Sequence, residues 1–96
     1  MEDIVYYNEL YDLYGELLTD TQKKYFEDYY FHNLSFSEMA DTYHVSRNAV
    51  FKQIHIVIDK LNEYENKLHL LEKKNQITMI IQDCSKDVKK RIEDLL

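Results

Sequence analysis

Apolar residues recur at helical spacing in the first part of the chain. Over residues 1–18, tyrosines and leucines repeat at i, i+3, i+4 and i+7, while acidic residues occupy the opposite side. This pattern predicts a first helix over residues 1–18, and we expect Gly15 to let another helix approach closely. The inward stripe of this helix consists of Tyr7, Leu10, Tyr11, Tyr14, Leu17 and Leu18.

Hydroxyl residues mark where the next helices begin. Thr19 with Gln22, and Ser35 with Glu38, have the spacing of a capping box, in which each side chain accepts a backbone N–H of the other residue. The first pair predicts a second helix from Thr19 to Asn33, because asparagine tolerates the left-handed backbone that often ends a helix. Its inward face is aromatic and consists of Tyr25, Phe26, Tyr29 and Tyr30.

Residues 35–58 have the pattern of a helix-turn-helix. A short helix follows Ser35, and the small Ala40 within it suits a close crossing of two helices. His44 then falls where the chain must turn, and we expect a left-handed backbone there. Ser46 caps the next helix. A short capped helix, a tight turn and a second helix with polar first turns describe a DNA-reading motif.

The helix after Ser46 divides into two faces. Its inward face carries Val50, Ile54, Val57 and Ile58, and its outward face carries Ser46, Arg47, Asn48, Lys52 and Gln53. The serine and the first free N–H groups can hold a phosphate, the arginine can pair with a guanine, and the amides suit an adenine edge. Any exposed helix start carries similar residues, so contact with DNA, with RNA or with a protein stays open.

A heptad pattern starts in this helix and runs beyond it. Val50, Ile54, Val57, Leu61, Tyr64, Leu68 and Leu71 alternate spacings of four and three. No residue within 46–74 stops a helix, and a continuous helix of that length spans about 43 Å. A compact chain of this size is roughly 30 Å across. The helix should therefore overhang its domain, and the apolar residues there need a cover.

Two partners can cover this seam. The C-terminal segment repeats the heptad and folds back if residues 72–76 bend, although they can equally stay helical. A second copy of the chain is the other partner, and heptads on two segments favour a homodimer. Arg91 falls on the last seam and either weakens it or pairs with an acid across it. The predicted dimer contacts are Leu61, Tyr64, Leu68, Leu71, Ile77, Ile81 and Val88.

Composition favours an all-α fold. The chain has no proline and one glycine among 96 residues, so little interrupts its helices. We expect a helix-turn-helix domain over residues 1–58, unrelated to winged helices, and a long helical extension over residues 59–96. Neither a membrane span nor a secretory signal is expected. A lone Cys84 fits a reducing cytosol, so we expect a cytoplasmic protein.

Charge and chemistry narrow the function. Of the net charge of −6, all lies in residues 1–34, where eight acidic residues face two lysines. Tight DNA binders usually carry a basic face, so strong unaided DNA binding is disfavoured. The four histidines are dispersed, and Cys84 on an apolar stripe should be a small buried side chain. We expect no metal, no cofactor and no enzymatic activity.

Several short runs within residues 5–75 match a known family. They are Leu17-Leu18-Thr19 with Lys23 and Tyr25, Leu34-Ser35, Glu38-Met39-Ala40, Val45-Ser46-Arg47, Ala49-Val50 and Lys67-Leu68-His69-Leu70-Leu71-Glu72-Lys73. On these runs the chain resembles the YlxM family of small bacterial helix-turn-helix proteins, and more distantly region 4 of sigma factors. That family is typically encoded beside the GTPase of the signal recognition particle.

The resemblance implies a cytosolic, dimeric regulatory accessory of that pathway, which contacts the particle's RNA or its GTPase. Sigma-like proteins place an aliphatic residue where this chain has Gln53, with Ile54 one position later. That departure and the sparse basic residues argue against promoter-type DNA recognition. Three hypotheses follow: a regulatory partner of the signal recognition particle, a dimeric DNA-binding transcription regulator, and a dimerising adaptor that binds no nucleic acid.

Overall fold

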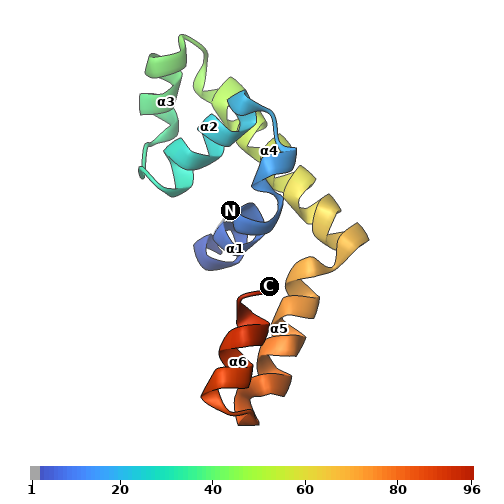
Figure 1. Cartoon of the computed structure of the whole chain (residues 1–96). Coiled ribbons are helices and arrows are strands. Elements are labelled where there is room, and N and C mark those ends of the chain that lie inside the picture. The colour runs from blue at the N-terminus through green and yellow to red at the C-terminus, as the bar shows by residue number, and fades with distance from the viewer. Residues whose placement is uncertain (1–2) are drawn as a thin grey trace.

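The computed structural model describes residues 3–96, and within that range every regular element is helical (Figure 1). The all-α prediction is confirmed. The molecule is elongated, with extents of 53 × 25 × 22 Å. The α-helices are α1 (Ile4–Tyr14), α2 (Asp20–Tyr30), α3 (Phe36–Tyr43), α4 (Arg47–Leu68), α5 (Leu70–Ile80) and α6 (Lys86–Glu93), with short 3₁₀ helices η1 (Gly15–Leu17) and η2 (Ile81–Asp83).

The predicted helix caps are confirmed. The Thr19 hydroxyl oxygen accepts the Gln22 N–H at 3.2 Å, and the Gln22 side chain accepts the Thr19 N–H at 2.9 Å. Ser35 and Glu38 form the same reciprocal pair at 3.1 and 3.0 Å. These local bonds satisfy N–H groups that a helix start leaves free. They explain why α2 and α3 begin one residue after their caps.

The first helix is shorter than the sequence indicates. Residues 1–2, where we expected it to start, lie outside the described residues, and Asp3 caps α1 by accepting the Tyr6 N–H at 3.0 Å. The helix tightens into η1 after Tyr14, which turns Leu17 outward, with 55% of the residue exposed. The inward position predicted for Leu17 is wrong because a 3₁₀ turn changes the helical phase.

Gly15 has a different role from the one expected. A Cβ at this position would lie 3.2 Å from Cε1 of the Tyr11 ring, which belongs to the preceding helix itself. The glycine therefore makes room for an aromatic ring of α1. The prediction that it lets another helix approach closely is wrong.

Aromatic and aliphatic side chains from α1 to α5 form one core. Tyr14, Tyr25 and Tyr30 are buried, which confirms the inward tyrosine stripes, and the Tyr11 ring stacks on Phe26 at 4.2 Å. Tyrosine hydroxyls reach carboxylates at the edge of this core, as in the bond from Tyr11 to Glu27. The fully buried side chains with the largest volumes are Tyr14, Phe26, Leu10, Met39, Ile54, Leu61, Val50 and Val57.

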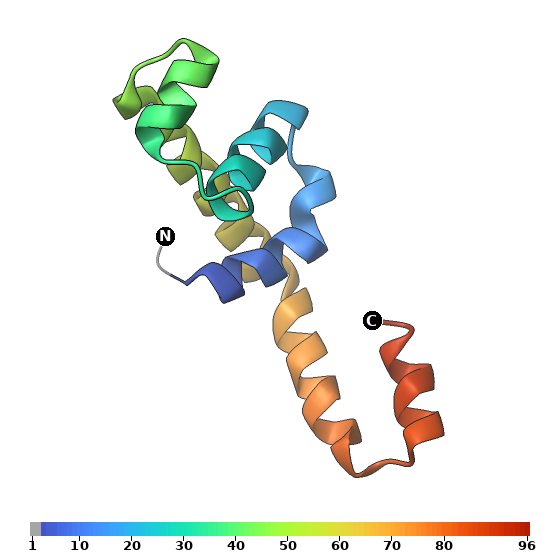
Figure 2. The same ribbon diagram turned by 90° about the vertical axis from the view of Figure 1, so that its left-hand side faces the viewer.

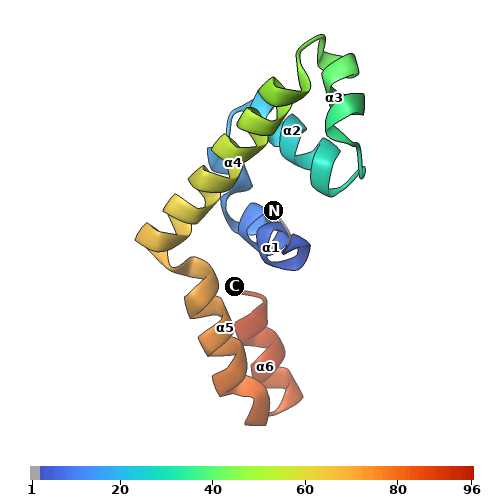
Figure 3. The ribbon, with the colours of Figure 1, turned by 180° about the vertical axis from the view of Figure 1, so that it is seen from behind.

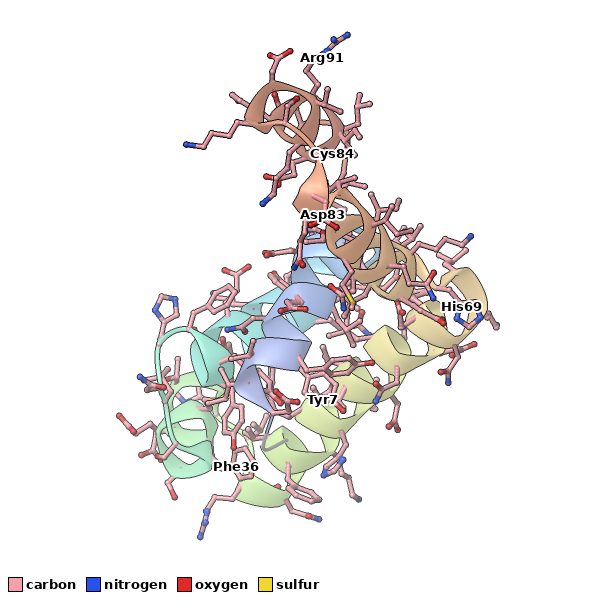
Figure 4. All side chains as sticks on the ribbon, turned by 90° about the horizontal axis from the view of Figure 1, so that it is seen from below. Tyr7, Phe36, His69, Asp83, Cys84 and Arg91 are labelled. Carbon is pink, nitrogen blue, oxygen red and sulfur yellow. The ribbon has the colours of Figure 1, made fainter. Side chains whose placement is uncertain are left out.

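The helix predicted over residues 46–74 is interrupted at His69. This residue has φ 55° and ψ 30°, so α4 ends at Leu68 and α5 begins at Leu70 (Figure 4). The His69 N–H still donates to the Glu65 carbonyl at 2.8 Å, as at many helix ends. The uninterrupted prediction is wrong because a non-glycine residue takes a left-handed conformation that the local sequence does not require.

Glu65 stabilises this interruption from the last turns of α4. Its Oε1 accepts the Tyr14 hydroxyl at 2.6 Å and the Leu71 N–H at 3.0 Å, and its Oε2 accepts the Glu72 N–H at 3.1 Å. The Tyr14 oxygen in turn accepts the Leu70 N–H at 3.1 Å. The first N–H groups of α5 are thus satisfied by a carboxylate and a hydroxyl. We call these residues the Glu65 network.

The C-terminal segment folds back as a helical hairpin. Figures 1 and 2 show α6 returning beside α5, with the end of the chain near α1. Residues 72–76 stay helical within α5, and the bend lies later, between η2 and the Ser85 cap of α6. Cys84 lies in that bend and is exposed, so its predicted burial is wrong (Figure 4).

The overhanging seam is covered by α1. Leu61 and Leu71 are 0% and 4% exposed and belong to the same core as Leu10 and Tyr14. Helix α1 packs against both α4 and α5, and this cover is neither of the two that the sequence suggested. The domain boundary predicted after residue 58 falls inside α4, and the core continues across it.

The seven predicted dimer contacts are in different environments. Leu61, Leu71 and Ile81 are buried within this chain, while Tyr64 and Ile77 are half-buried. Leu68 and Val88 remain 46% and 42% exposed, so a second copy could reach them directly. The dimer itself stays a prediction.

Candidate nucleic-acid interface

Helices α3 and α4 form the helix-turn-helix at the end of the molecule remote from the hairpin (Figures 1 and 3). Met39 and Ala40 on α3 are buried in the same core as Val50 and Ile54 on α4. The turn between them is made by His44, whose φ of 57° and ψ of 44° confirm the predicted left-handed backbone. This rigid crossing holds the start of α4 at the surface.

The residues predicted to face outward lie on that surface. Ser46, Arg47, Asn48 and Lys52 are exposed, and Gln53 is half-buried on the flank of α4. The Ser46 hydroxyl oxygen accepts the Ala49 N–H at 3.0 Å, so its lone pair serves the helix and its proton is left for a ligand. The N–H groups of Arg47 and Asn48 have no acceptor within the helix. The structure brings these five residues together, but their binding role stays a prediction.

Positive charge at this surface is modest. Within residues 3–96, Arg47 and Lys52 make no salt bridge, so both cations are available to an anion. Lys24 on α2 lies 5.9 Å from the centroid of the Tyr43 ring, at the C-terminal end of α3. Glu38 is on the same motif and is committed to capping α3. Two or three cations neutralise few phosphates, so binding by charge alone would be weak.

Sequence reasoning missed an aromatic row beside these cations. The Tyr29 ring stacks on Phe36 at 5.1 Å, Phe36 meets Phe51 edge-to-face at 5.8 Å, and Phe51 meets His55 at 4.3 Å. We call these four residues the aromatic row. Phe36 lies where α3 meets the first turns of α4 (Figure 4). The sequence carried a hint, because Phe51 stands one turn after Arg47 on a face expected to be polar.

No three His, Cys, Asp or Glu side chains gather into a metal-binding group in the part of the chain that the structure describes. None of the helices within residues 3–96 is both long and apolar enough to cross a membrane. The described fold and its exposed α4 start define a helix-turn-helix protein.

Comparison with known proteins identifies the family. The UPF0122 family, described as "Putative helix-turn-helix protein, YlxM / p13 like", matches residues 1–95. The chain therefore belongs to this family, which confirms the resemblance predicted from its short sequence runs.

Individual relatives agree with this assignment. A UPF0122 protein of Shouchella clausii is 50% identical over 66 residues, which are 69% of this chain and 61% of that protein. A probable UPF0122 protein of Mycoplasma mycoides is 41% identical over 81 residues, 84% of this chain and 72% of its own length. A UPF0122 protein of Halalkalibacterium halodurans is 40% identical over 84 residues, which are 88% of this chain and 77% of that protein. The first match thus spans less than two thirds of the relative.

Proposed function

We propose that this protein is a regulatory helix-turn-helix protein that binds RNA through the first turns of α4. The observation that carries the proposal is the exposure of Arg47, Asn48 and Lys52 on a rigid, capped helix start, without salt-bridge partners for the two cations within residues 3–96. Polar side chains on such a helix can pair with phosphates and base edges. The small positive charge favours a folded RNA or a ribonucleoprotein over random duplex DNA.

The proposed pathway is that of the signal recognition particle. The resemblance to the YlxM family supports this choice, since it implies contact with the particle's RNA or with its GTPase. A cytoplasmic location and a role without catalysis belong to the same proposal. The acidic N-terminal helices suit such a partner, because they would repel nucleic acid that approaches elsewhere on the protein.

A dimeric DNA-binding transcription regulator is the second candidate. Two-fold operators need two recognition helices on one object, and a homodimer would supply them. Uncovered apolar residues at the end of α4 and on the hairpin support dimerisation: Leu68 at the end of α4 is 46% exposed, and Met79, Ile80 and Val88 on the hairpin are 71%, 75% and 42% exposed. The same residues would suffice for a dimerising adaptor that binds no nucleic acid.

The test is a fluorescence-anisotropy titration at about 0.1 M salt, where phosphate contacts still contribute. It compares the particle's RNA, that RNA bound to its GTPase, and random duplex DNA. Wild type is measured beside Arg47→Ala and beside Arg91→Ala. Arg91 is also exposed but lies on α6, away from the motif, so it is the matched control for loss of one charge (Figure 4).

Each outcome selects one function. Binding to the RNA or its complex that is weakened by Arg47→Ala and not by Arg91→Ala supports the regulatory proposal. Binding to DNA alone, lost with Arg47, overturns it in favour of the transcription regulator. If no nucleic acid binds wild type, and the protein's cellular function is lost with Leu68→Ala but kept with Arg47→Ala, the dimerising adaptor is the remaining candidate.

A further inference from the structure

We propose that the RNA site includes an unpaired nucleobase that stacks on the ring of Phe51. This inference rests on the proposed RNA binding and names the chemical class that the site recognises. Phe51 is 41% exposed although it belongs to the helix that carries Arg47 and Lys52. Part of the phenylalanine ring leaves apolar surface in water beside two cations, and a stacked nucleobase would cover that surface.

The Phe51 ring is held in place by its neighbours. Phe36 contacts it edge-to-face at 5.8 Å with an interplanar angle of 77°, and His55 contacts it at 4.3 Å and 62°. Phe36 is itself stacked on Tyr29 at 5.1 Å. These contacts restrict the rotation of the Phe51 side chain while leaving part of its surface free. A base that stacks on it would therefore lose less side-chain entropy than on a mobile ring.

The position of Phe51 relative to the cations suits a single strand. Arg47 precedes it by one turn of α4, which makes the two side chains neighbours on the helix surface, and Lys52 follows directly. Single-strand sites typically combine cations that follow the phosphates with aromatic rings that accept bases. Phe51 and the two cations together reproduce that combination on the first turns of α4.

The charge of the molecule favours an unpaired base over a duplex. Duplex binding draws much of its free energy from phosphate neutralisation, and this surface offers few cations. Stacking contributes about 1–3 kcal/mol per base and does not depend on net charge. A buried base pair offers no free face to Phe51. A methyl contact to thymine in the major groove is the duplex alternative, and the test separates the two.

The chain has nine tyrosines and no tryptophan, so Phe51→Trp introduces a single tryptophan whose emission can be excited apart from that of the tyrosines. The probes are oligoadenylate and oligouridylate of equal length, an RNA duplex, and a DNA duplex with adenine–thymine pairs. The variants are Phe51→Trp, Phe51→Leu, Arg47→Ala and Ile56→Ala. Ile56 is a matched control, because it is 43% exposed and apolar on the same helix but outside the aromatic row.

We expect oligoadenylate to bind more tightly than oligouridylate, because the larger purine ring stacks better. Phe51→Trp should keep this binding and show quenching of its emission. Phe51→Leu should weaken oligoadenylate binding about 5-fold to 150-fold without changing its salt dependence. Arg47→Ala should lower the slope of log affinity against log salt by about 0.7. Ile56→Ala should change neither quantity.

The failures are distinguishable. If RNA binds and responds to Arg47→Ala while Phe51→Leu leaves affinity unchanged, RNA binding stands and stacking is overturned. If wild type binds the particle's RNA but neither oligonucleotide, stacking is overturned and RNA binding stands; if the particle's RNA does not bind either, both proposals fall. Preference for the DNA duplex over both single strands, lost with Phe51→Leu, assigns the ring to a thymine methyl instead. Thermal unfolding of each variant shows whether Phe51→Leu has loosened the fold, and Phe51→Trp tests the ring without removing it.

Discussion

At the scale of single residues, Glu65 joins α1, α4 and α5 through one carboxylate. Burial of this group would raise its pKa. The hydrogen bonds from the Tyr14 hydroxyl and from the Leu71 and Glu72 N–H groups outweigh that effect, with a further contribution from the charge of His69, and hold the Glu65 pKa below its ordinary 4.5. The ionised carboxylate is therefore the form that the fold stabilises.

Glu65→Gln should lower the free energy of unfolding by about 1–3 kcal/mol, because a neutral amide offers one acceptor oxygen where two served three donors. Urea denaturation measures the change. Glu63→Gln is the control, since Glu63 is exposed and, among residues 3–96, forms a salt bridge only with Lys67 on the same helix at 2.8 Å. A variant as stable as wild type at position 65 would contradict the importance of the Glu65 network.

The stability of the fold should also depend on pH through Glu65. Because the Glu65 pKa is lower in the folded protein than in the unfolded chain, its contribution is complete above about pH 4.5 and is lost as pH falls through the folded-state pKa. Urea midpoints measured from pH 6 down to pH 3 should therefore fall less steeply for Glu65→Gln than for wild type. Parallel curves for the two proteins would rule out this linkage.

Residues whose partners are close in sequence could be predicted, and those with distant partners could not. Ser35 and Ser46 were identified as caps because each bonds to an N–H three residues later. Glu65 was missed because its partner Tyr14 lies 51 residues away. Phe51 was missed for a related reason: its exposure depends on how α3 crosses α4, which spacing alone does not fix.

At the scale of elements, two histidines end helices in the left-handed conformation. His44 has φ 57° and His69 has φ 55°. The first was predicted, because the helix-turn-helix pattern demands a turn there. The second was not, since apolar residues continue in register on both sides of it. A heptad pattern thus indicates which face is apolar, but it does not show whether one helix or two carry it.

His69→Gly should raise the free energy of unfolding by about 1 kcal/mol, because glycine adopts this conformation without a Cβ clash. The exposed contact of His69 with Glu72 at 3.1 Å is a small loss by comparison. His55→Gly should lower stability by about 1 kcal/mol, since the same exchange then falls inside α4. Chemical denaturation of both variants measures the sign of the change in the free energy of unfolding. Destabilisation by His69→Gly would contradict the left-handed backbone conformation assigned to His69.

At the scale of the whole molecule, the all-α class and the motif followed from composition and periodicity, while the cover of the seam did not. Periodicity shows that Leu61 and Leu71 face something apolar, but it cannot identify that partner. The structure assigns it to α1 through Tyr14 and its neighbours. The C-terminal bend was equally hidden, because the chain lacks the glycine or proline that would have marked it.

Substitutions of Leu61 and Leu68 should distinguish the effect of a side chain on folding stability from its effect on self-association. Leu61 is fully buried, so Leu61→Ala should cost about 2–5 kcal/mol of stability. Leu68 is 46% exposed, so Leu68→Ala should leave monomer stability nearly unchanged and weaken self-association of the proposed dimer. Urea denaturation at low protein concentration and sedimentation equilibrium measure the two effects. Equal destabilisation by both variants would contradict the burial pattern.

The course of α4 has a geometric consequence. Its first turns carry Arg47 and Lys52, and its last turns carry Glu65, which fixes the direction of α5. No flexible linker therefore separates the surface proposed to bind RNA from the hairpin at the other end of the molecule. Partners bound at the two ends would therefore be kept at a set distance and orientation by α4. Lengthening α4 by whole turns would change that distance in steps of about 5.4 Å.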